Sequence, residues 1–207
     1  MEPMKNKAIL LLGPTGAGKT PLGDGLAERG LFGRRCVHFD FGAQLRQVAE
    51  HGGRGLVAND VAYVQRVLAE GALLEEDTFH IARAILEAFM AEEDVGAQDL
   101  VVLNGLPRHA GQARDVGKIM DVILVAALEC TAGIVHERIA TNSGGDRADR
   151  VDDSVAEIAR KLEIYAERTQ PLLAHYRSED ITCRPIPVGV ETTPVDLVEE
   201  VLKSIEI

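Results

Sequence analysis

The residues with the clearest chemical meaning form a glycine-rich run near the start of the chain, GPTGAGKT over residues 13–20. In the spacing G-x-x-x-x-G-K-T, the glycines let backbone N–H groups curl around a triphosphate. The lysine of such a loop reaches the outer phosphates, and the hydroxyl of the threonine can ligate Mg²⁺. The run therefore predicts an ATP site in which Thr20 is the magnesium ligand. The residues of this site are Gly13, Gly16, Ala17, Gly18, Lys19 and Thr20.

The elements that must position this loop are indicated by apolar runs that alternate with helix-period stretches. The runs are short and typical of buried parallel strands, and they cover residues 8–12, 35–39, 100–104, 122–127 and 183–188. The helical stretches include residues 21–28, a long amphipathic segment over 152–177 and a last one over 193–205. We expect an α/β protein of three α/β/α layers, with a five-stranded parallel sheet and the site at the carboxyl ends of its strands.

Two segments interrupt the alternation of strands and helices. Residues 40–75 form a helical block, and residues 139–149 form a short polar loop that contains glycine. Mobile segments beside a phosphate loop are typical of an enzyme that closes over its substrates. We expect one domain over residues 1–207. Its core is made of residues 1–39, 76–138 and 150–207, residues 40–75 are a helical insert, and residues 139–149 are a short lid.

Composition excludes several classes of partner. The net charge is −11, from 33 acidic residues against 22 lysines and arginines. Nucleic acid polymers and anionic membranes require a basic surface, so neither is an expected partner. The three cysteines show no metal or redox spacing, and no apolar run approaches the length of a membrane span. We expect a monomeric cytoplasmic protein.

Six segments, in order, resemble the nucleoside monophosphate kinases, and the adenylate kinases in particular. They are GPTGAGKT, FGAQLR, NGLPRHAGQA, HERI, RVDD and RKLEIYAERTQPLLAHY, so the resemblance runs almost from end to end. It implies the reversible transfer of the γ-phosphoryl group of Mg-ATP to AMP. It also implies that the whole chain has the fold of a P-loop kinase. It also implies that residues 40–75 bind the nucleoside monophosphate, and that residues 139–149 are a short lid without the cysteines of a zinc-binding lid.

The resemblance assigns a role to individual residues. Lys19 would hold the ATP phosphates and Arg138 would pack on the adenine of ATP. Arg150 and Lys161 would act on the transferring phosphoryl group, with Arg160 as the alternative to Lys161. The acceptor nucleotide would be bound by Phe41, Gly42, Arg46, Gly105, Arg108 and Gln112.

The chemistry of phosphoryl transfer agrees with a site of this kind. Negative charge spreads over the equatorial oxygens, so catalysis consists mostly of positioning and convergent cations. The acceptor phosphate, with a second pKa of about 6, needs no general base. The planar fork of Arg46 or Arg108 matches two phosphate oxygens, and the amide of Gln112 can both donate to and accept from an adenine edge. These features favour AMP over pyrimidine monophosphates.

Several residues depart from the family pattern. Asn104 stands where the family has an aspartate that orients magnesium-bound water, and because an amide supplies no charge, weaker magnesium binding is expected. Phe41 and Ala43 replace a threonine and an aspartate, Asp40 replaces a small hydroxyl residue, and Asn142 stands at a common lid arginine. The ATP half of the pattern is thus kept, while the acceptor half is altered.

Two other functions stay open from the sequence. One is a P-loop kinase of a small hydroxylated metabolite, of the shikimate or gluconate kinase type, in which Asp40 would act as a base. The other is a nucleotide-binding regulator with reduced catalysis, for which the departures at Asn104, Phe41, Ala43 and Asn142 are the evidence.

Overall fold

A parallel sheet forms the centre of the computed structural model, which describes residues 5–146 and 154–203. Its five strands lie in the order β2-β3-β1-β4-β5, and every pairing between neighbours is parallel. The strands are β1 (Asn6–Leu12), β2 (Cys36–Asp40), β3 (Leu100–Asn104), β4 (Met120–Glu129) and β5 (Thr182–Pro187). Each corresponds to one of the apolar runs, which confirms the predicted sheet.

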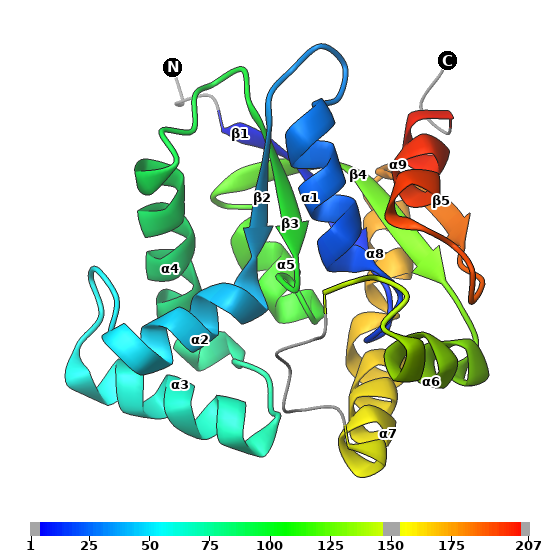
Figure 1. Cartoon of the computed structure of the whole chain (residues 1–207). Helices are drawn as coiled ribbons and strands as arrows, with labels where there is room; N and C mark the ends of the chain where they lie inside the picture. Colours follow the sequence, from blue (N-terminus) through cyan, green and yellow to red (C-terminus); the bar gives the residue numbers. More distant parts are fainter. Residues whose placement is uncertain (1–4, 147–153, 204–207) are drawn as a thin grey trace.

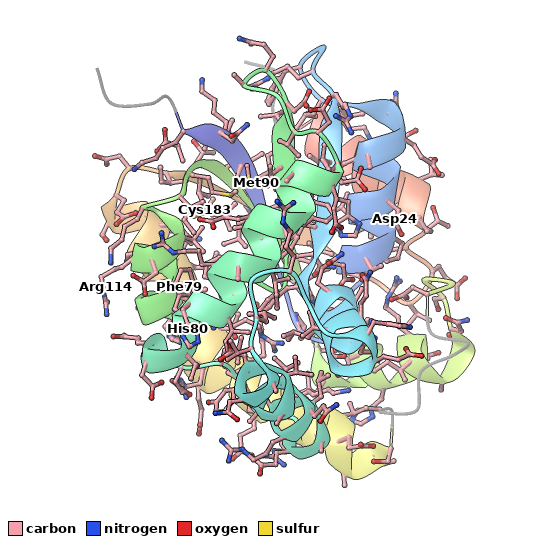
Figure 2. The ribbon with its side chains drawn as sticks, turned by 90° about the vertical axis from the view of Figure 1, so that its left-hand side faces the viewer. Asp24, Phe79, His80, Met90, Arg114 and Cys183 are labelled. Atoms are coloured by element: carbon pink, nitrogen blue, oxygen red, sulfur yellow. The ribbon has the colours of Figure 1, made fainter. Side chains whose placement is uncertain are left out.

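Helices cover both faces of this sheet (Figure 1). On one face lie α1 (Lys19–Arg29) and α9 (Pro194–Lys203). On the other lie α4 (Phe79–Glu92), α5 (Ala110–Val116) and α8 (Leu172–Ser178). Figure 2 views the molecule from the side of α4, with Phe79 and Met90 near the two ends of that helix. The arrangement confirms the three-layer α/β/α fold.

The alternation of side chains along β1 explains why the sheet has two cores. Ala8, Leu10 and Leu12 pack on the α4 side, whereas Ile9 and Leu11 pack on the α1 side. Successive side chains of a strand point to opposite faces, and a strand covered on both faces must be apolar throughout. This double burial gives the strand its continuous apolar run, and it fixes where the loop after Leu12 leaves the sheet.

Two pairs of helices lie beyond the carboxyl ends of the strands (Figure 1). The insert contributes α2 (Phe41–His51) and α3 (Ala58–Glu70), which bury Leu45, Val48, Val64 and Val67 in the α4-side core. On the other side lie α6 (Ala132–Thr141) and α7 (Val155–Ile164). A short 3₁₀ turn, η1 (Glu76–Thr78), connects the end of the insert to α4.

The single long helix predicted over residues 152–177 is wrong in its middle. The chain instead forms α7, a π-helical turn η2 (Tyr165–Thr169) and then α8. The N–H of Gln170 donates to the Tyr165 carbonyl at 2.8 Å, five residues back. Pro171 follows and has no N–H to continue an α-helical ladder, which explains the change of winding at this point.

Two further features concern the whole of the described chain. Cys36, Cys130 and Cys183 are free thiols. Within residues 5–146 and 154–203, no helix combines the length and the apolar character needed to cross a bilayer.

Candidate functional site

The glycine-rich loop joins β1 to α1 with two residues in the left-handed region. Gly16 has φ of 73° and Gly18 has φ of 97°, conformations that L side chains rarely adopt. Space is also short, because a Cβ on Gly16 would lie 2.8 Å from Ile139 Cγ1 and one on Gly18 would lie 2.8 Å from Leu197 Cδ1. Gly18 is the N-cap of α1, so the positive end of that helix faces the loop, as in other anion-binding sites.

Lys19 lies on the inner side of this loop. Its Nζ donates to the carbonyls of Gly13 at 2.8 Å and Pro14 at 2.7 Å. The ammonium group is therefore held where the loop curls, and it lines a cavity together with Gly13, Gly16 and Gly18. Ala17 is fully buried and packs beneath the loop in the α1-side core rather than in the cavity.

The cavity extends from the glycine-rich loop to the insert, and it gathers positive charge. Among the described residues, four cationic side chains line it: Lys19, Arg46, Arg108 and Lys161. Two acidic residues, Asp40 and Asp146, also belong to its wall. In a chain with a net charge of −11, this gathering of cations from four separate segments indicates a site for a polyanion.

Arg46 and Arg108 approach the cavity from different elements, α2 and the segment after β3. Within the described ranges, neither guanidinium group makes a hydrogen bond or ion pair with another side chain or carbonyl. Burial withdraws water from Arg108 and lowers the pKa of its guanidinium group, although an arginine stays charged at neutral pH. Cations without carboxylate partners, facing one cavity, can take a phosphate between them.

Apolar side chains form the wall of the cavity on the side of the insert. They come from α2 and from the end of α3 with the segment after it: Phe41, Leu45, Val67, Leu68, Leu73 and Leu74. Phe41 is only 4% exposed and stacks on Phe39, with ring centroids 5.9 Å apart. Its ring therefore belongs mainly to the core and narrows the cavity. Such a wall suits a flat, largely apolar group better than a polyol.

Gly42 and Gly105 line the cavity on the side of the insert. A Cβ on Gly42 would lie 3.6 Å from Arg46 Nη1. Gly105 has φ of 85°, and a Cβ there would lie 3.6 Å from Phe41 Cβ. Both distances are ordinary contacts, so the positive φ of Gly105, and not a lack of space, is what favours glycine there.

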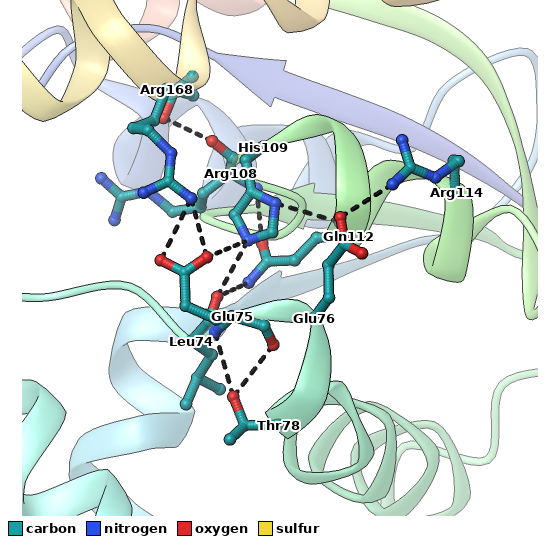
Figure 3. A network of polar contacts seen from close by, with 10 residues as sticks. Leu74, Glu75, Glu76, Thr78, Arg108, His109, Gln112, Arg114 and Arg168 are labelled. Atoms are coloured by element: carbon teal, nitrogen blue, oxygen red, sulfur yellow. Dashed lines mark hydrogen bonds and ion pairs between the residues drawn. The ribbon is translucent and has the colours of Figure 1, made fainter.

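Gln112 is almost completely buried at the start of α5 and joins three segments (Figure 3). Its Oε1 accepts from the N–H of Arg108 at 2.7 Å, and its Nε2 donates to the carbonyl of Leu74 at 2.8 Å. The Leu74 carbonyl also accepts from His109 Nε2 at 3.0 Å. An amide has two N–H groups and two lone pairs, so Gln112 keeps one of each beyond these bonds.

Thr20, Asp40 and Asn104 meet at the carboxyl ends of the strands. The Thr20 hydroxyl donates to Asp40 Oδ2 at 2.8 Å. Asn104 Nδ2 lies 3.1 Å from both Thr20 Oγ1 and Asp40 Oδ2. Hard oxygen ligands of this kind fit Mg²⁺, which takes few protein groups and binds chiefly to phosphates and water. Thr20 thus lies beside a carboxylate and an amide, and its binding of Mg²⁺ stays a prediction. Within the described ranges, no three His, Cys, Asp or Glu side chains form a metal-binding cluster, at this position or at any other.

Arg138 lies outside the lining of the cavity, against the rear of the glycine-rich loop. It is 2% exposed, and its guanidinium group donates to the carbonyl of Gly16 at 3.2 Å and to that of Gly189 at 2.8 Å. The same group reaches the carbonyls of Val190 and Thr192. Burial lowers the pKa of this side chain. Its contacts fasten the loop to the segment before α9, and packing on adenine stays a prediction.

The remaining predicted groups come from α7, from the end of α6 and from residues that the structure does not describe. Lys161 lines the cavity, whereas its alternative, Arg160, is exposed and does not. Arg150 lies outside the described residues, as do residues 147–149 of the predicted lid. Asn142 ends α6 as a left-handed C-cap with φ of 49°.

Two contacts of the site were not predicted from the sequence. One is the cluster of Thr20, Asp40 and Asn104, which depends on the register of β2 against β3. The other is the Leu74 carbonyl, the acceptor that fixes Gln112. A backbone carbonyl carries no signal in the sequence. Asp40 did carry a signal, because a carboxylate directly after an apolar run is expected at the carboxyl end of a strand.

Comparisons with known proteins place the chain among nucleotide-binding proteins. The family model described as AAA domain matches residues 12–159. A curated relative called adenylate kinase, from Parvibaculum lavamentivorans, is 29% identical over 83% of this chain and 80% of its own length. Another of the same name, from Prochlorococcus marinus strain MIT 9303, is 29% identical over 84% of this chain and 86% of its own length.

A solved structure shares the fold. It is a gluconokinase from Sinorhizobium meliloti 1021, with a TM-score of 0.54 over 97% of this chain and 92% of that one. Its sequence identity to this chain is 16%, so the likeness concerns the arrangement of strands and helices alone.

Proposed function

The chain belongs to the AAA domain family, and from that premise we propose that it is an adenylate kinase, which reversibly transfers the γ-phosphoryl group of Mg-ATP to AMP. It is an ATP-dependent phosphotransferase of the P-loop kinase type. The observation that carries the proposal is the shared cavity, in which the glycine-rich loop faces Arg46 and Arg108. Relatives called adenylate kinase support the choice of reaction.

In this reaction an oxygen of the AMP phosphate attacks the γ-phosphorus of ATP. The bond from that phosphorus to the β–γ bridging oxygen breaks, and both products are ADP. Lys19 and the N–H groups of the loop hold the donor phosphates, while Arg46 and Arg108 hold the acceptor phosphate and reduce the repulsion between the two anions. Lys161, from α7, adds charge at the same cavity. Bound Mg²⁺ would neutralise phosphate charge beside Thr20.

AMP is the proposed acceptor because of the shape and polarity of the insert side. The apolar wall there suits a purine, and Gln112 keeps one N–H and one lone pair for the edge of a base. The segment that carries Arg108 is itself fixed by Gln112, so reading of the base and binding of the phosphate would be coupled.

Asp40 is poorly suited to the role of a base toward a metabolite hydroxyl. Its Oδ1 accepts from the N–H of Ala43 at 2.9 Å, and its Oδ2 accepts from Thr20 and Asn104. A general base must reach the proton that it removes, whereas both oxygens of this carboxylate are directed to groups of the protein.

A panel of acceptors tests the proposal. The purified protein is mixed with Mg-ATP and AMP, GMP, CMP, UMP, dTMP, gluconate or shikimate, and the products are separated by chromatography. We expect ADP to form with AMP at least tenfold faster than any product forms with the other acceptors. A Lys19→Ala protein, prepared identically, measures the activity of any contaminating kinase. Preferred phosphorylation of gluconate or shikimate, or binding of ATP without any turnover, would contradict the proposal.

A further inference from the structure

Asp40 and Asn104 occupy paired positions at the ends of two neighbouring parallel strands, β2 and β3. Both side chains contact the Thr20 hydroxyl, and Asn104 also contacts Asp40. We infer that Asp40 is the positioning carboxylate of the magnesium–nucleotide complex, and that it supplies the negative charge that Asn104 lacks. This inference rests on the proposed function, because it requires a magnesium nucleotide in the glycine-rich loop.

The direction of the hydrogen bonds supports this role. The hydroxyl proton of Thr20 is directed to Asp40 Oδ2, and one lone pair of Thr20 Oγ1 accepts from Asn104. A hydroxyl oxygen has two lone pairs, so the other can face a cation. Asp40 thereby fixes the orientation of the Thr20 hydroxyl and places a negative charge beside the residue that would bind the metal. Groups that orient a metal ligand in this way typically contribute about 10- to 100-fold to metal affinity.

Capping of α2 does not account for the carboxylate. Asp40 is the N-cap of this helix, and its Oδ1 alone makes the capping bond, to the N–H of Ala43. Asparagine and serine cap helices about as well as aspartate does. The second oxygen, Oδ2, is directed instead at Thr20.

The neighbourhood of Asn104 explains why the charge resides on β2 and not on β3. His38 Nδ1 lies 2.8 Å from Asp24 Oδ1, so in a neutral imidazole Nε2 is the acceptor, and Asn104 Nδ2 lies 3.4 Å from it. The same amide nitrogen lies 3.1 Å from Asp40 Oδ2. The two N–H groups of the amide face three acceptors, Thr20 Oγ1, Asp40 Oδ2 and His38 Nε2, so one N–H is shared between two of them. A second carboxylate in place of the amide would instead face Asp40 with like charge.

The test measures magnesium-dependent nucleotide binding, without an acceptor and without turnover. Calorimetry gives the Kd of an ATP analogue whose β–γ bridging oxygen is replaced by NH, once with Mg²⁺ and once with EDTA. The Kd in EDTA divided by the Kd with Mg²⁺ is the factor by which the metal tightens binding. We expect Asp40→Asn to lower this ratio about 10- to 100-fold while the Kd in EDTA stays the same or falls. Glu87→Gln, on the exposed side of α4, is the matched control and should leave the ratio unchanged.

A reciprocal pair of variants separates the charge from the residue. Asp40→Ser keeps an N-cap and should lower the ratio like Asp40→Asn. Adding Asn104→Asp to it returns a carboxylate to the cluster from β3, and we expect the ratio to recover to within about threefold of the wild type. Thermal unfolding checks that each variant is folded.

Two results would overturn the inference. They are an unchanged ratio in Asp40→Asn, whether binding is kept under both conditions or lost equally under both, and no recovery of the ratio in the double variant. A wild-type protein that does not bind the analogue under either condition would instead contradict the proposed function. The two failures are therefore distinguishable.

Discussion

The side-chain amide of Gln112 donates to the carbonyl of Leu74 at 2.8 Å, across 38 positions of the chain. One residue at the start of α5 thus fixes the point at which the insert rejoins the core. Because Gln112 also accepts from the N–H of Arg108, the insert and a predicted phosphate-binding residue share one support.

Replacement of this amide by a side chain of similar shape should affect stability and acceptor binding together. Gln112→Met leaves the Leu74 carbonyl and the Arg108 N–H with fewer partners, and burial without a partner costs about 1–3 kcal/mol. We expect the free energy of unfolding, measured with urea, to fall by about that amount, and the KM for AMP to rise. Gln47→Met, at an exposed position of α2, is the control. Equal losses in the two variants would show that the buried amide has no special role.

Removal of the Arg108 guanidinium group should weaken the acceptor and spare the donor. A hydrogen bond to a charged group contributes about 1.5–3 kcal/mol, so Arg108→Ala should lower kcat/KM for AMP about 10- to 150-fold. The Kd for ATP should stay within about twofold, because the loop and Lys19 are unchanged. Steady-state kinetics and calorimetry measure the two effects, with Arg83→Ala on the exposed side of α4 as control. An equal loss of ATP affinity would contradict the assignment of Arg108 to the acceptor.

The ion pair beside this support should make stability depend on pH. Arg168 Nη2 donates to both carboxylate oxygens of Glu75, at 3.2 and 2.9 Å, and this lowers the pKa of Glu75 (Figure 3). A lowered pKa stabilises the fold above the unfolded value of about 4.3, and the gain is lost as the pH falls through the folded value. Both side chains are nearly half exposed, so the gain should be below about 1 kcal/mol.

Glu75→Gln removes this charge and tests its contribution. The wild type should be the more stable protein at pH 7, by urea unfolding, and the difference should shrink at pH 3. A difference of the same size at both pH values would assign it to packing rather than to the ion pair.

A second carboxylate beside Asp40 should produce the opposite pH dependence. In Asn104→Asp, two carboxyl groups would lie at the distance now separating Asn104 Nδ2 from Asp40 Oδ2, 3.1 Å, and the pKa of one of them should rise. A raised carboxyl pKa stabilises the fold only below the folded value, so without metal this variant should lose stability as the pH rises from 5 to 8. Thermal unfolding in EDTA at both pH values measures this, with the wild type as reference. A variant as stable as the wild type at pH 8 would contradict the close contact.

Much of the fold could be predicted because the strands are buried on both faces. A strand such as Leu100–Asn104 must be apolar along its whole length, and this leaves a clear run in the sequence. The phosphate loop was predictable because Gly16 and Gly18 are required by backbone geometry as well as by chemistry. The break in the long helix was not predicted, since a π-turn before Pro171 leaves the apolar spacing nearly intact.

The contacts within the site could be predicted only in part. Motif spacing named Lys19, Arg46 and Arg108, and all three line the cavity. Spacing gives no strand register, so the contact of Asp40 with Asn104 could not be inferred. The sequence alone indicates a loss of charge at Asn104, and not an amide that contacts a carboxylate.

Transfer of a labelled phosphoryl group tests the central claim most directly. The protein is mixed with Mg²⁺, AMP and ATP labelled with ³²P at the γ-phosphorus, the reaction is stopped within one turnover, and the labelled products are separated. A cavity that holds two nucleotides with facing phosphates predicts that the label appears in ADP, and that it does so far more slowly in the Arg46→Ala and Arg108→Ala proteins. Label released only as inorganic phosphate, or label in ADP at unchanged rates in both variants, would contradict it.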